Sequence, residues 1–378
     1  IKESQSPFSS NIVLVRKRDN SLRLCIDFRK LNARTKRDCF NIPRIETLID
    51  SLRGAKYYAC LDLISGYLQV LVSSEHQERT AFSTPVGFYE YVRMPFGLRN
   101  APSTFQRMME KVLDGLNMKI CAVYLDDIIV YAETKSELYA NLAKVFDRFR
   151  SANLRLKPKK CKFFEPHIDF LGHRVSPQGV ECSQSHIEDV LKWPEPTNIK
   201  ELQTYLGFAN FFRRFVPGFA EIADPLTRLL KGHCHKKKSK FKSKSKKTKP
   251  DSSSSEPTPW HWGDEQRDAF TKIKSILTSS QCLAYPDFSK SFTLHCDASR
   301  LGLGAAIYQK DETGKLRPVA YGSRTLNATE KNYSAHKLEF LALKWAITVK
   351  FPYYLYSDKV IDVYTDHNPL VYLTTSAK

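Results

Sequence analysis

The 378-residue sequence lacks several features that would assign it to well-known classes of protein. It has no uninterrupted apolar run of about 18 residues, so we expect no membrane-spanning segment, and its N-terminus has no signal-peptide pattern. Its nine cysteines are odd in number and include no C-x-x-C pair, which argues against a disulfide framework and against a zinc finger. These absences favour reduced thiols in the cytosol or the nucleus, and hence an intracellular protein.

Acidic residues are scarce relative to basic ones, because 40 Asp and Glu stand against 59 Lys and Arg, a formal net charge of +19. This excess favours a partner with many negative charges, nucleic acid first and an anionic membrane surface second. Hydrophobic residues make up 42% of the chain, enough for two or three domains to have a core. Residues 231–259 are the exception: lysines alternate with serines and prolines follow, which predicts a disordered basic linker.

Apolar periodicity predicts the elements on either side of this linker. Before it we expect hairpins over 11–27 and 80–92, a strand over 57–63, a strand-turn-strand over 120–131, a strand pair formed by 161–164 and 170–175, and helices over 44–52, 101–113, 136–151 and within 187–230. After it we expect strands over 291–296, 304–309, 319–323 and 360–365, with a helix over 333–350. Strands followed by a helix and another strand are typical of an α/β unit.

The most informative stretch is Tyr124-Leu125-Asp126-Asp127, which lies between two apolar runs. A hairpin would place both acids at its tip, and adjacent carboxylates repel unless a positive group lies nearby. Taken alone, such a turn is more often an ordinary solvent-facing one. Asp62, on a strand that looks buried, supplies a third acid. Three acids from two such segments can hold two magnesium ions, the arrangement used in nucleotidyl transfer.

Five blocks then resemble, in order, the reverse transcriptase motifs of gypsy-class long-terminal-repeat retrotransposons: LCIDFRKLN at 24–32, LDLISGY at 61–67, MPFGL at 94–98, YLDD at 124–127 and FLGH at 170–173. The resemblance implies an α+β right-hand polymerase, with an antiparallel palm sheet, fingers and a helical thumb or connection, followed by a partial ribonuclease H-like α/β domain. The expected domains are fingers and palm at 1–175, thumb or connection at 176–230, the linker at 231–259 and the ribonuclease H-like domain at 260–378.

The resemblance also implies roles for particular residues. Asp62, Asp126 and Asp127 would be the metal-binding catalytic acids, and Tyr67 the steric gate that excludes a ribose 2′-hydroxyl. The incoming triphosphate would contact Arg23 together with Lys17 or Arg16, while Phe96 and Gly97 would lie near the nucleotide pocket. Leu171, Gly172 and His173 would grip the primer, although a core strand is an equally good interpretation. Arg213 and Arg214, beside an aromatic stripe, could touch a nucleic-acid backbone, whereas the stripe itself is usual packing.

Asp297, Glu339 and Asp366 resemble the first three acids of a retroelement ribonuclease H. They would come from a strand, a helix and a strand end, as a second two-metal site requires. The family adds a fourth acidic or histidine ligand after the third acid, and the sequence stops about a dozen residues beyond Asp366. We therefore expect a C-terminally truncated domain and weak or absent hybrid cleavage by this length of chain.

The leading hypothesis is an RNA-directed and DNA-directed DNA polymerase with two Mg²⁺ ions per active site and Mn²⁺ as an alternative. Its partners would be an RNA template, a DNA primer, an RNA:DNA hybrid and deoxynucleoside triphosphates. It would act in cytoplasmic virus-like particles or in the nucleus, without a membrane, and a dimer stays open. A second hypothesis is a transposon remnant that only binds nucleic acid, favoured by the missing N-terminus, the missing C-terminus and the lysine insert, whereas the three intact acids and Tyr67 favour the enzyme. An RNA-templated RNA polymerase is disfavoured by the ring of Tyr67.

Overall fold

The computed structural model describes residues 1–16, 20, 22–233, 259–279, 282–356 and 358–366. They divide into two compact units, the first made of Ile1–Leu171 with Val175–Pro177 and the second of Gly172–Arg174 with the chain from Gln178 onward. Most of the expected basic linker lies outside the described residues. Within those residues, none of the helices combines the length and the apolar character needed to cross a bilayer.

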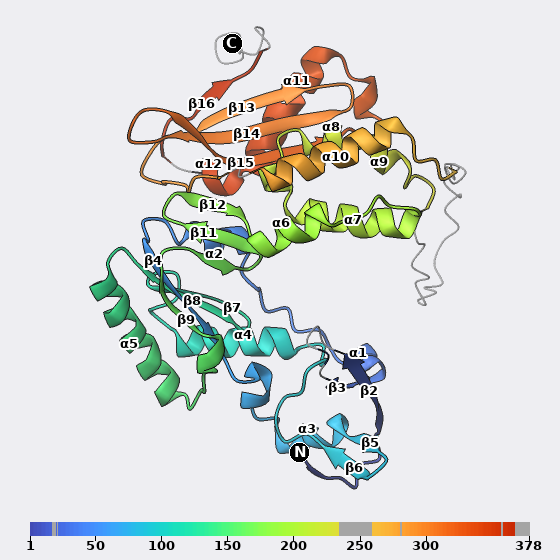
Figure 1. Cartoon of the computed structure of the whole chain (residues 1–378), viewed down its shortest axis with the longest axis vertical. Coiled ribbons are helices and arrows are strands. Elements are labelled where there is room, and N and C mark those ends of the chain that lie inside the picture. Colours follow the sequence, from blue (N-terminus) through green and yellow to red (C-terminus); the bar gives the residue numbers. More distant parts are fainter. Residues whose placement is uncertain (17–19, 21, 234–258, 280–281, 357, 367–378) are drawn as a thin grey trace. The chain divides into compact units, whose positions relative to one another are not determined.

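The first unit contains a five-stranded sheet in the order β1-β6-β5-β2-β3 (Figure 1). The expected hairpins are present, because β2 pairs antiparallel with β3 and β5 with β6. The tip of the first hairpin lies outside the described residues except for Asn20. The strands are β1 (Lys2–Glu3), β2 (Ser10–Arg16), β3 (Leu22–Ile26), β5 (Phe82–Thr84) and β6 (Gly87–Glu90), and the neighbouring helices are α1 (Arg29–Arg34) and α3 (Ser74–Gln77).

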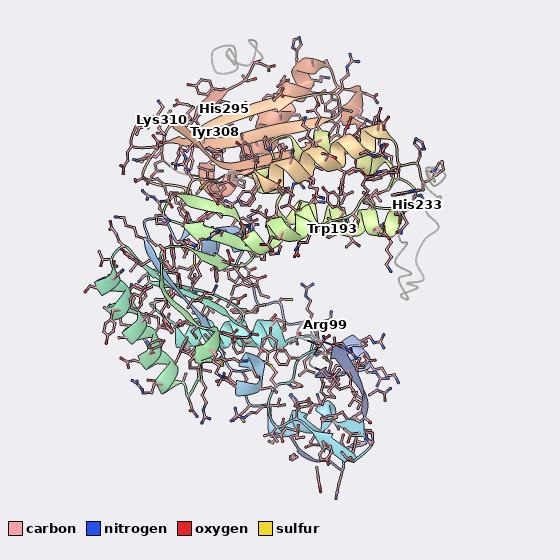
Figure 2. All side chains as sticks on the ribbon, in the orientation of Figure 1. Arg99, Trp193, His233, His295, Tyr308 and Lys310 are labelled. Atoms are coloured by element: carbon pink, nitrogen blue, oxygen red, sulfur yellow. The ribbon has the colours of Figure 1, made fainter. Side chains whose placement is uncertain are left out.

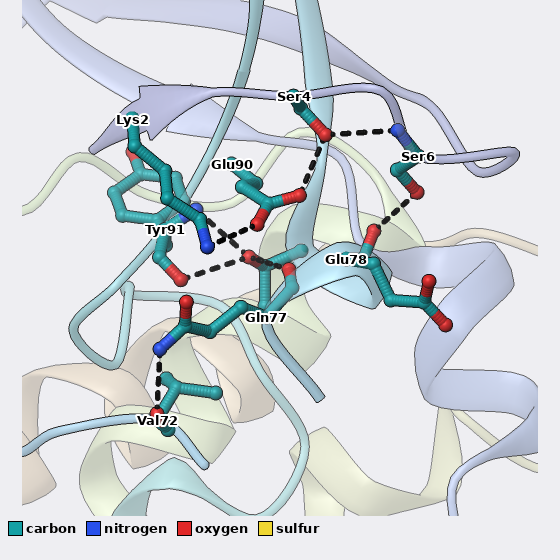
Figure 3. A network of polar contacts seen from close by, with 9 residues as sticks. Lys2, Ser4, Ser6, Val72, Gln77, Glu78, Glu90 and Tyr91 are labelled. Atoms are coloured by element: carbon teal, nitrogen blue, oxygen red, sulfur yellow. Dashed lines mark hydrogen bonds and ion pairs between the residues drawn. The ribbon is translucent and has the colours of Figure 1, made fainter. Parts of the chain in front are cut away.

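A buried carboxylate fixes the N-terminal strand to this sheet (Figure 3). Glu90 accepts a hydrogen bond of 2.6 Å from the Ser4 hydroxyl, and its other oxygen lies 3.1 Å from the Lys2 ammonium. The Ser4 hydrogen bond, and after it Lys2, holds the pKa of Glu90 below its ordinary value despite burial. Close by, the Ser6 hydroxyl donates 2.6 Å to the carbonyl of Glu78. These contacts connect the residues before β2 to the sheet that carries the expected triphosphate-binding hairpin.

A second sheet of this unit has the order β7-β8-β4-β9 and carries the three acids expected for polymerisation. The helices α4 and α5 contribute apolar side chains to the same hydrophobic core as its strands, among them Phe105 of α4 and Val145 of α5. The Thr134 side chain caps α5 by accepting from the N–H of Glu137. The elements are α2 (Ile45–Asp50), β4 (Tyr57–Asp62), α4 (Ala101–Val112), β7 (Cys121–Tyr124), β8 (Asp127–Ala132), α5 (Lys135–Ser151) and β9 (Lys162–Glu165).

The expected strand pair of 161–164 with 170–175 is wrong. The first of these segments forms β9, which pairs antiparallel with β4. The second is broken in two, β10 (Ile168–Phe170) and β11 (His173–Ser176), with β12 (Gly179–Cys182) after them. The break occurs because Leu171 and Gly172 both have a positive φ, 50° and 79°, which ends one strand and starts the next.

The helical pattern expected within 187–230 is confirmed in the second unit by α6 (Gln184–Leu191), α7 (Ile199–Phe211), α8 (Phe219–Ile222) and α9 (Asp224–Arg228). The chain is described again before α10 (Asp264–Thr278). The buried ring of Tyr205, in α7, lies 4.6 Å between centroids from that of Phe270 in α10. This contact packs α10 on α7.

The second unit also contains a four-stranded sheet in the order β15-β14-β13-β16, in which β13 and β16 are parallel. Its elements are β13 (Thr293–Ala298), β14 (Gly302–Lys310), β15 (Leu316–Thr325), α11 (Ala335–Trp345), α12 (Pro352–Leu355) and β16 (Asp362–Tyr364). Leu338 and Ala342 of α11 share a core with Leu294 of β13. The helix expected over 333–350 changes before its end, because residues 346–350 widen into a π-helix, and Val349 there is 67% exposed.

Candidate active sites

The first site is built by the register of two neighbouring strands. β4 and β8 pair antiparallel so that Asp62, the last residue of β4, stands opposite Asp127, the first residue of β8. Leu125 and Asp126 form the two-residue turn between β7 and β8, where Tyr124 pairs with Asp127. The structure therefore brings together the three acids on which the polymerase hypothesis depends.

Burial and like charge act on these carboxylates together. Burial first, then the charges of Asp127 and Asp62, raises the pKa of Asp126 to about 6. The pKa of Asp127 is also raised, by burial and then by Asp62. The Oδ1 atom of Asp126 is buried and has no hydrogen-bond partner. A hard divalent cation bound through carboxylate oxygens would relieve both the repulsion and this unsatisfied oxygen, so the residues fit Mg²⁺.

A cation of the protein itself already lies at this site. The ammonium of Lys160 is 3.3 Å from Oδ2 of Asp62, and both side chains are partly exposed. The sequence did not single out Lys160. The available signal was the lysine-rich stretch 157–162, which precedes and enters β9, the strand beside β4.

The expected steric gate lies beside the acids. The Tyr67 ring packs 5.2 Å from that of Phe96 and 5.2 Å, edge-on, from that of Phe105. Burial first, and then Asp126, raises the pKa of Tyr67 to about 12. Gly66 is buried against the turn, and a Cβ built on it would lie 2.7 Å from Asp126 Oδ1. Gly66, the residue before Tyr67, thus lies directly against the acidic turn.

The loop that carries Phe96 and Gly97 is fixed by an asparagine. Gly97 has φ +92°, which favours glycine, and its carbonyl accepts 2.8 Å from the Asn32 side chain. The same side chain accepts 2.8 Å from the N–H of Arg99. Asn32 is the last residue of the first motif block, so this contact joins two blocks that are 65 residues apart.

The residues expected to contact the triphosphate are only partly described. Arg16 is an exposed residue at the end of β2. Arg23 lies in β3 opposite Val15. Lys17 lies outside the described residues. The structure therefore places Arg16 and Arg23 on one hairpin and leaves their role as a prediction.

The second site is in the other unit. One ligand oxygen from each of Asp297, Glu339 and Asp366 lies within 4.8 Å of the others, and among the described residues this is the group of three that could hold a metal ion in this way. Burial first, then Asp366 and Asp297, raises the pKa of Glu339 to about 7. Its Oε2 is buried without a hydrogen-bond partner. These residues also fit a divalent cation.

A pocket of about 570 Å³ adjoins this second cluster and is lined by Asp297, Asp366 and aromatic residues of the sheet. The ring of His295 lies 4.8 Å from that of Tyr308 on the neighbouring strand and 5.0 Å from that of Tyr364 (Figure 2). Burial lowers the pKa of His295. The sequence did not identify this aromatic lining, because its members are neighbours only across strands.

The side chains expected to contact nucleic acid are largely inside the second unit. His173 is 3% exposed, and its ring lies 5.5 to 5.7 Å from those of Phe211, Phe212 and Phe215. This burial favours the core interpretation for the His173 side chain, and its role in gripping a primer stays a prediction. Leu171 and Gly172 form the turn before it, and their proposed role is untested.

Arg213 and Arg214 have partners inside the second unit, and their contact with a nucleic-acid backbone stays a prediction. Arg213 donates to the backbone carbonyl of Ser323, and burial lowers its pKa. Arg214 is 6% exposed and donates 3.5 Å to the carbonyl of Val319. Both guanidinium groups therefore satisfy carbonyls of β15 within the unit, which a linear pattern of arginines beside phenylalanines does not reveal.

Comparison with known families agrees with this division of sites. The family described as reverse transcriptase (RNA-dependent DNA polymerase) matches residues 15–175, and the RNase H-like domain found in reverse transcriptase matches residues 262–362.

Curated relatives are similar over nearly the whole chain. The retrovirus-related Pol polyproteins of the Drosophila melanogaster transposons opus and gypsy are 38% and 37% identical, each over 98% of this chain. A Tf2 transposon polyprotein of Schizosaccharomyces pombe is 30% identical over 98% of this chain. The chain covers 36%, 35% and 26% of these three relatives, about a third of their length or less.

Solved structures share the fold. A foamy viral protease-reverse transcriptase in complex with double-stranded DNA has a TM-score of 0.83 at 24% identity, over 100% of this chain and 61% of that one. The foamy viral enzyme in complex with an RNA/DNA hybrid has a TM-score of 0.78 at 24% identity, over 100% of this chain and 47% of that one. The fold is that of a right-hand polymerase with an additional α/β domain.

Proposed function

We propose that this chain, which belongs to the reverse transcriptase region of gypsy-type retrotransposon Pol polyproteins, polymerises DNA on an RNA or a DNA template. The observation that carries the proposal is the register of β4 and β8, which sets Asp62 opposite Asp127 beside the Asp126 turn. The net charge of +19 supports an RNA template, a DNA primer and their hybrid as partners. The site of action would be the cytoplasmic virus-like particle or the nucleus, and a dimer is compatible with the proposal.

Asp62, Asp126 and Asp127 would hold two Mg²⁺ ions, or Mn²⁺ in their place. When bound, these ions activate the primer 3′-hydroxyl and neutralise the triphosphate and the leaving pyrophosphate. Side chains of the protein would select the nucleotide and bind its triphosphate. Tyr67, held by Phe96 and Phe105, excludes the 2′-hydroxyl and so selects deoxynucleotides. Arg16, Lys17 and Arg23 would supply permanent positive charge to the triphosphate oxygens.

Asp297, Glu339 and Asp366 would hold the metal of a second site that hydrolyses the RNA strand of an RNA:DNA hybrid. The support is the convergence of their oxygens within 4.8 Å. Cleavage of a labelled hybrid should be lost in Asp297→Asn and kept in Asp358→Asn, which changes an exposed acid outside the group of three. Hybrid cleavage that persists in Asp297→Asn would contradict the proposed second site.

The polymerase proposal is tested by primer extension on an RNA template with deoxynucleotides and Mg²⁺. The wild-type chain should extend the primer, and Asp126→Asn should abolish extension. Asp147→Asn is a matched control, because Asp147 is an exposed residue of α5 that pairs only locally with Arg150. No extension by the wild-type chain, with salt-sensitive RNA binding retained, would favour the nucleic-acid-binding remnant instead.

A further inference from the structure

We infer that Gln106 is a positioning residue, which holds the Leu125-Asp126 turn and thereby the Asp126 carboxylate where a metal ion can bind. The inference rests on the proposed polymerase function of the acids on β4 and β8 and adds a residue on which that function depends. Gln106 lies on α4, is 0% exposed, and belongs to none of the acidic motifs.

The amide of Gln106 is satisfied entirely by the hairpin and its own helix. Its Oε1 accepts 2.7 Å from the N–H of Leu125, inside the turn. Its Nε2 donates 3.2 Å to the carbonyl of Val123 in β7 and 3.0 Å to Glu110 one helical turn away. Moving a buried amide that has partners at both ends would break its hydrogen bonds at a cost in free energy. The Gln106 side chain therefore holds the turn in place against α4.

The turn needs this support because its backbone is in an unfavourable conformation. Leu125 has φ +54°, a left-handed conformation that is unfavourable for a leucine because its Cβ crowds the following carbonyl oxygen. Without the Gln106 acceptor, the N–H of Leu125 would lose its partner. Turn conformations in which Leu125 has a negative φ would then be about as stable as the observed one. Gln106 therefore selects one turn conformation among several that a Leu-Asp loop could adopt.

The conformation of this turn decides where the Asp126 carboxylate lies. Asp126 follows Leu125 directly, and its buried Oδ1 sits against Gly66, where even a methyl group would come within 2.7 Å. The carboxylate is thus confined by Gly66 on one side and by its own backbone on the other. A metal site tolerates displacements of only about 0.5 Å, so a shift of the turn should appear first as weaker metal binding.

Metal binding can be measured without substrate, by electron paramagnetic resonance of Mn²⁺ added to the protein. All variants are made in the Asp297→Asn background, so that the second acidic group does not contribute. Gln106→Met keeps the side-chain volume and removes all three side-chain hydrogen bonds, the two to the hairpin and the one to Glu110. The control is Asn141→Leu, since Asn141 is buried on α5 and donates 3.1 Å to the carbonyl of Tyr131, near the opposite end of β8.

We expect Gln106→Met to weaken Mn²⁺ binding roughly 10-fold, with a matching rise in the Mg²⁺ concentration needed for half-maximal primer extension. Asn141→Leu should lower thermal stability comparably and leave both quantities unchanged. The double variant Gln106→Glu with Glu110→Gln keeps an acceptor for the N–H of Leu125 and should recover most of the Mn²⁺ affinity.

Two results would separate the inference from the function on which it rests. Wild-type primer extension, together with equal Mn²⁺ affinities for Gln106→Met and Asn141→Leu, would overturn the role of Gln106 alone. A wild-type chain that extends no primer, and whose Mn²⁺ binding is indifferent to Asp126→Asn, would overturn the polymerase proposal and the inference with it.

Discussion

The ammonium of Lys160 lies 3.3 Å from Oδ2 of Asp62, so a lysine of the chain is paired with one of the three acids that would hold a metal ion. This ion pair lowers the repulsion among the three acids in the metal-free protein. It also means that a bound cation must compete with Lys160 for Asp62. This ion pair joins two residues that are 98 positions apart in the sequence.

Lys160→Met should tighten Mn²⁺ binding about 2- to 5-fold, because the competing ammonium is gone, while lowering thermal stability only slightly, as for other partly exposed pairs. Mn²⁺ titration followed by electron paramagnetic resonance measures the first effect. Lys56→Met is the control, since it removes an exposed ion pair with Glu133 on the same sheet without touching the acids. Equal affinities in the two variants would show that Lys160 does not compete.

Gly66→Ala should reduce primer extension roughly 100-fold, because the new methyl group displaces the Asp126 carboxylate and a 1 Å misplacement at a reacting centre can cost that much. The fold should be little affected, since a carboxylate oxygen and the Phe105 ring edge are the groups that must move. Gly207→Ala is the matched control, as it lies in helix α7 with nothing near its Cβ position. A Gly66→Ala enzyme with wild-type rates would contradict the close contact.

Tyr67→Val should raise incorporation of ribonucleotides relative to deoxynucleotides on the order of 10- to 100-fold, because the ring that meets the 2′-hydroxyl is removed. Single-nucleotide incorporation with each triphosphate gives the ratio. Tyr67→Phe retains the ring and its contacts with Phe96 and Phe105, so its ratio should stay near that of the wild type. Unchanged discrimination in Tyr67→Val would assign the gate to another residue.

The pKa of Asp126, about 6 in the folded chain against an ordinary 3.8, predicts a pH dependence with a definite sign. Between these values the folded state holds a proton that the unfolded state has released, so metal-free stability should fall as the pH rises from about 4 to about 6. Metal binding needs the ionised form, so stabilisation by Mg²⁺ should be small at pH 5.5 and large at pH 8.

Thermal denaturation across this pH range, with and without Mg²⁺, measures both effects in the Asp297→Asn background. Asp126→Asn cannot titrate, so the variant should show a flatter metal-free profile and greater metal-free stability than its parent at pH 8. If the stability of the parent relative to that of Asp126→Asn does not fall between pH 4 and 6 in the absence of metal, the Asp126 carboxylate is not held in the protonated form.

The sequence alone predicted those features that depend on the types of neighbouring residues and their spacing along the chain. Continuous apolar runs on either side of Asp126 and Asp127 predicted β7 and β8, because short runs of this kind suit strands that are buried on both faces. The spacing of apolar residues predicted α4 and α5, because it indicates which face of each helix is buried. The blocks of motif residues also placed Asp62 correctly at the end of a strand.

Where a side chain finds its partner was decided only by the tertiary structure. The sequence left open whether His173 lies in the core or contacts a primer, and it gave no partner for Arg213. The fold buries His173 among phenylalanines and binds Arg213 to a carbonyl 110 residues away.

Gln106 and Lys160 show the converse, since neither stands out in the chain and each becomes important through one contact with a distant hairpin or strand. The physical reason is that local periodicity determines which residues face inward. The identity of the group they meet there depends on strand register and helix packing, which connect positions that are far apart in the sequence.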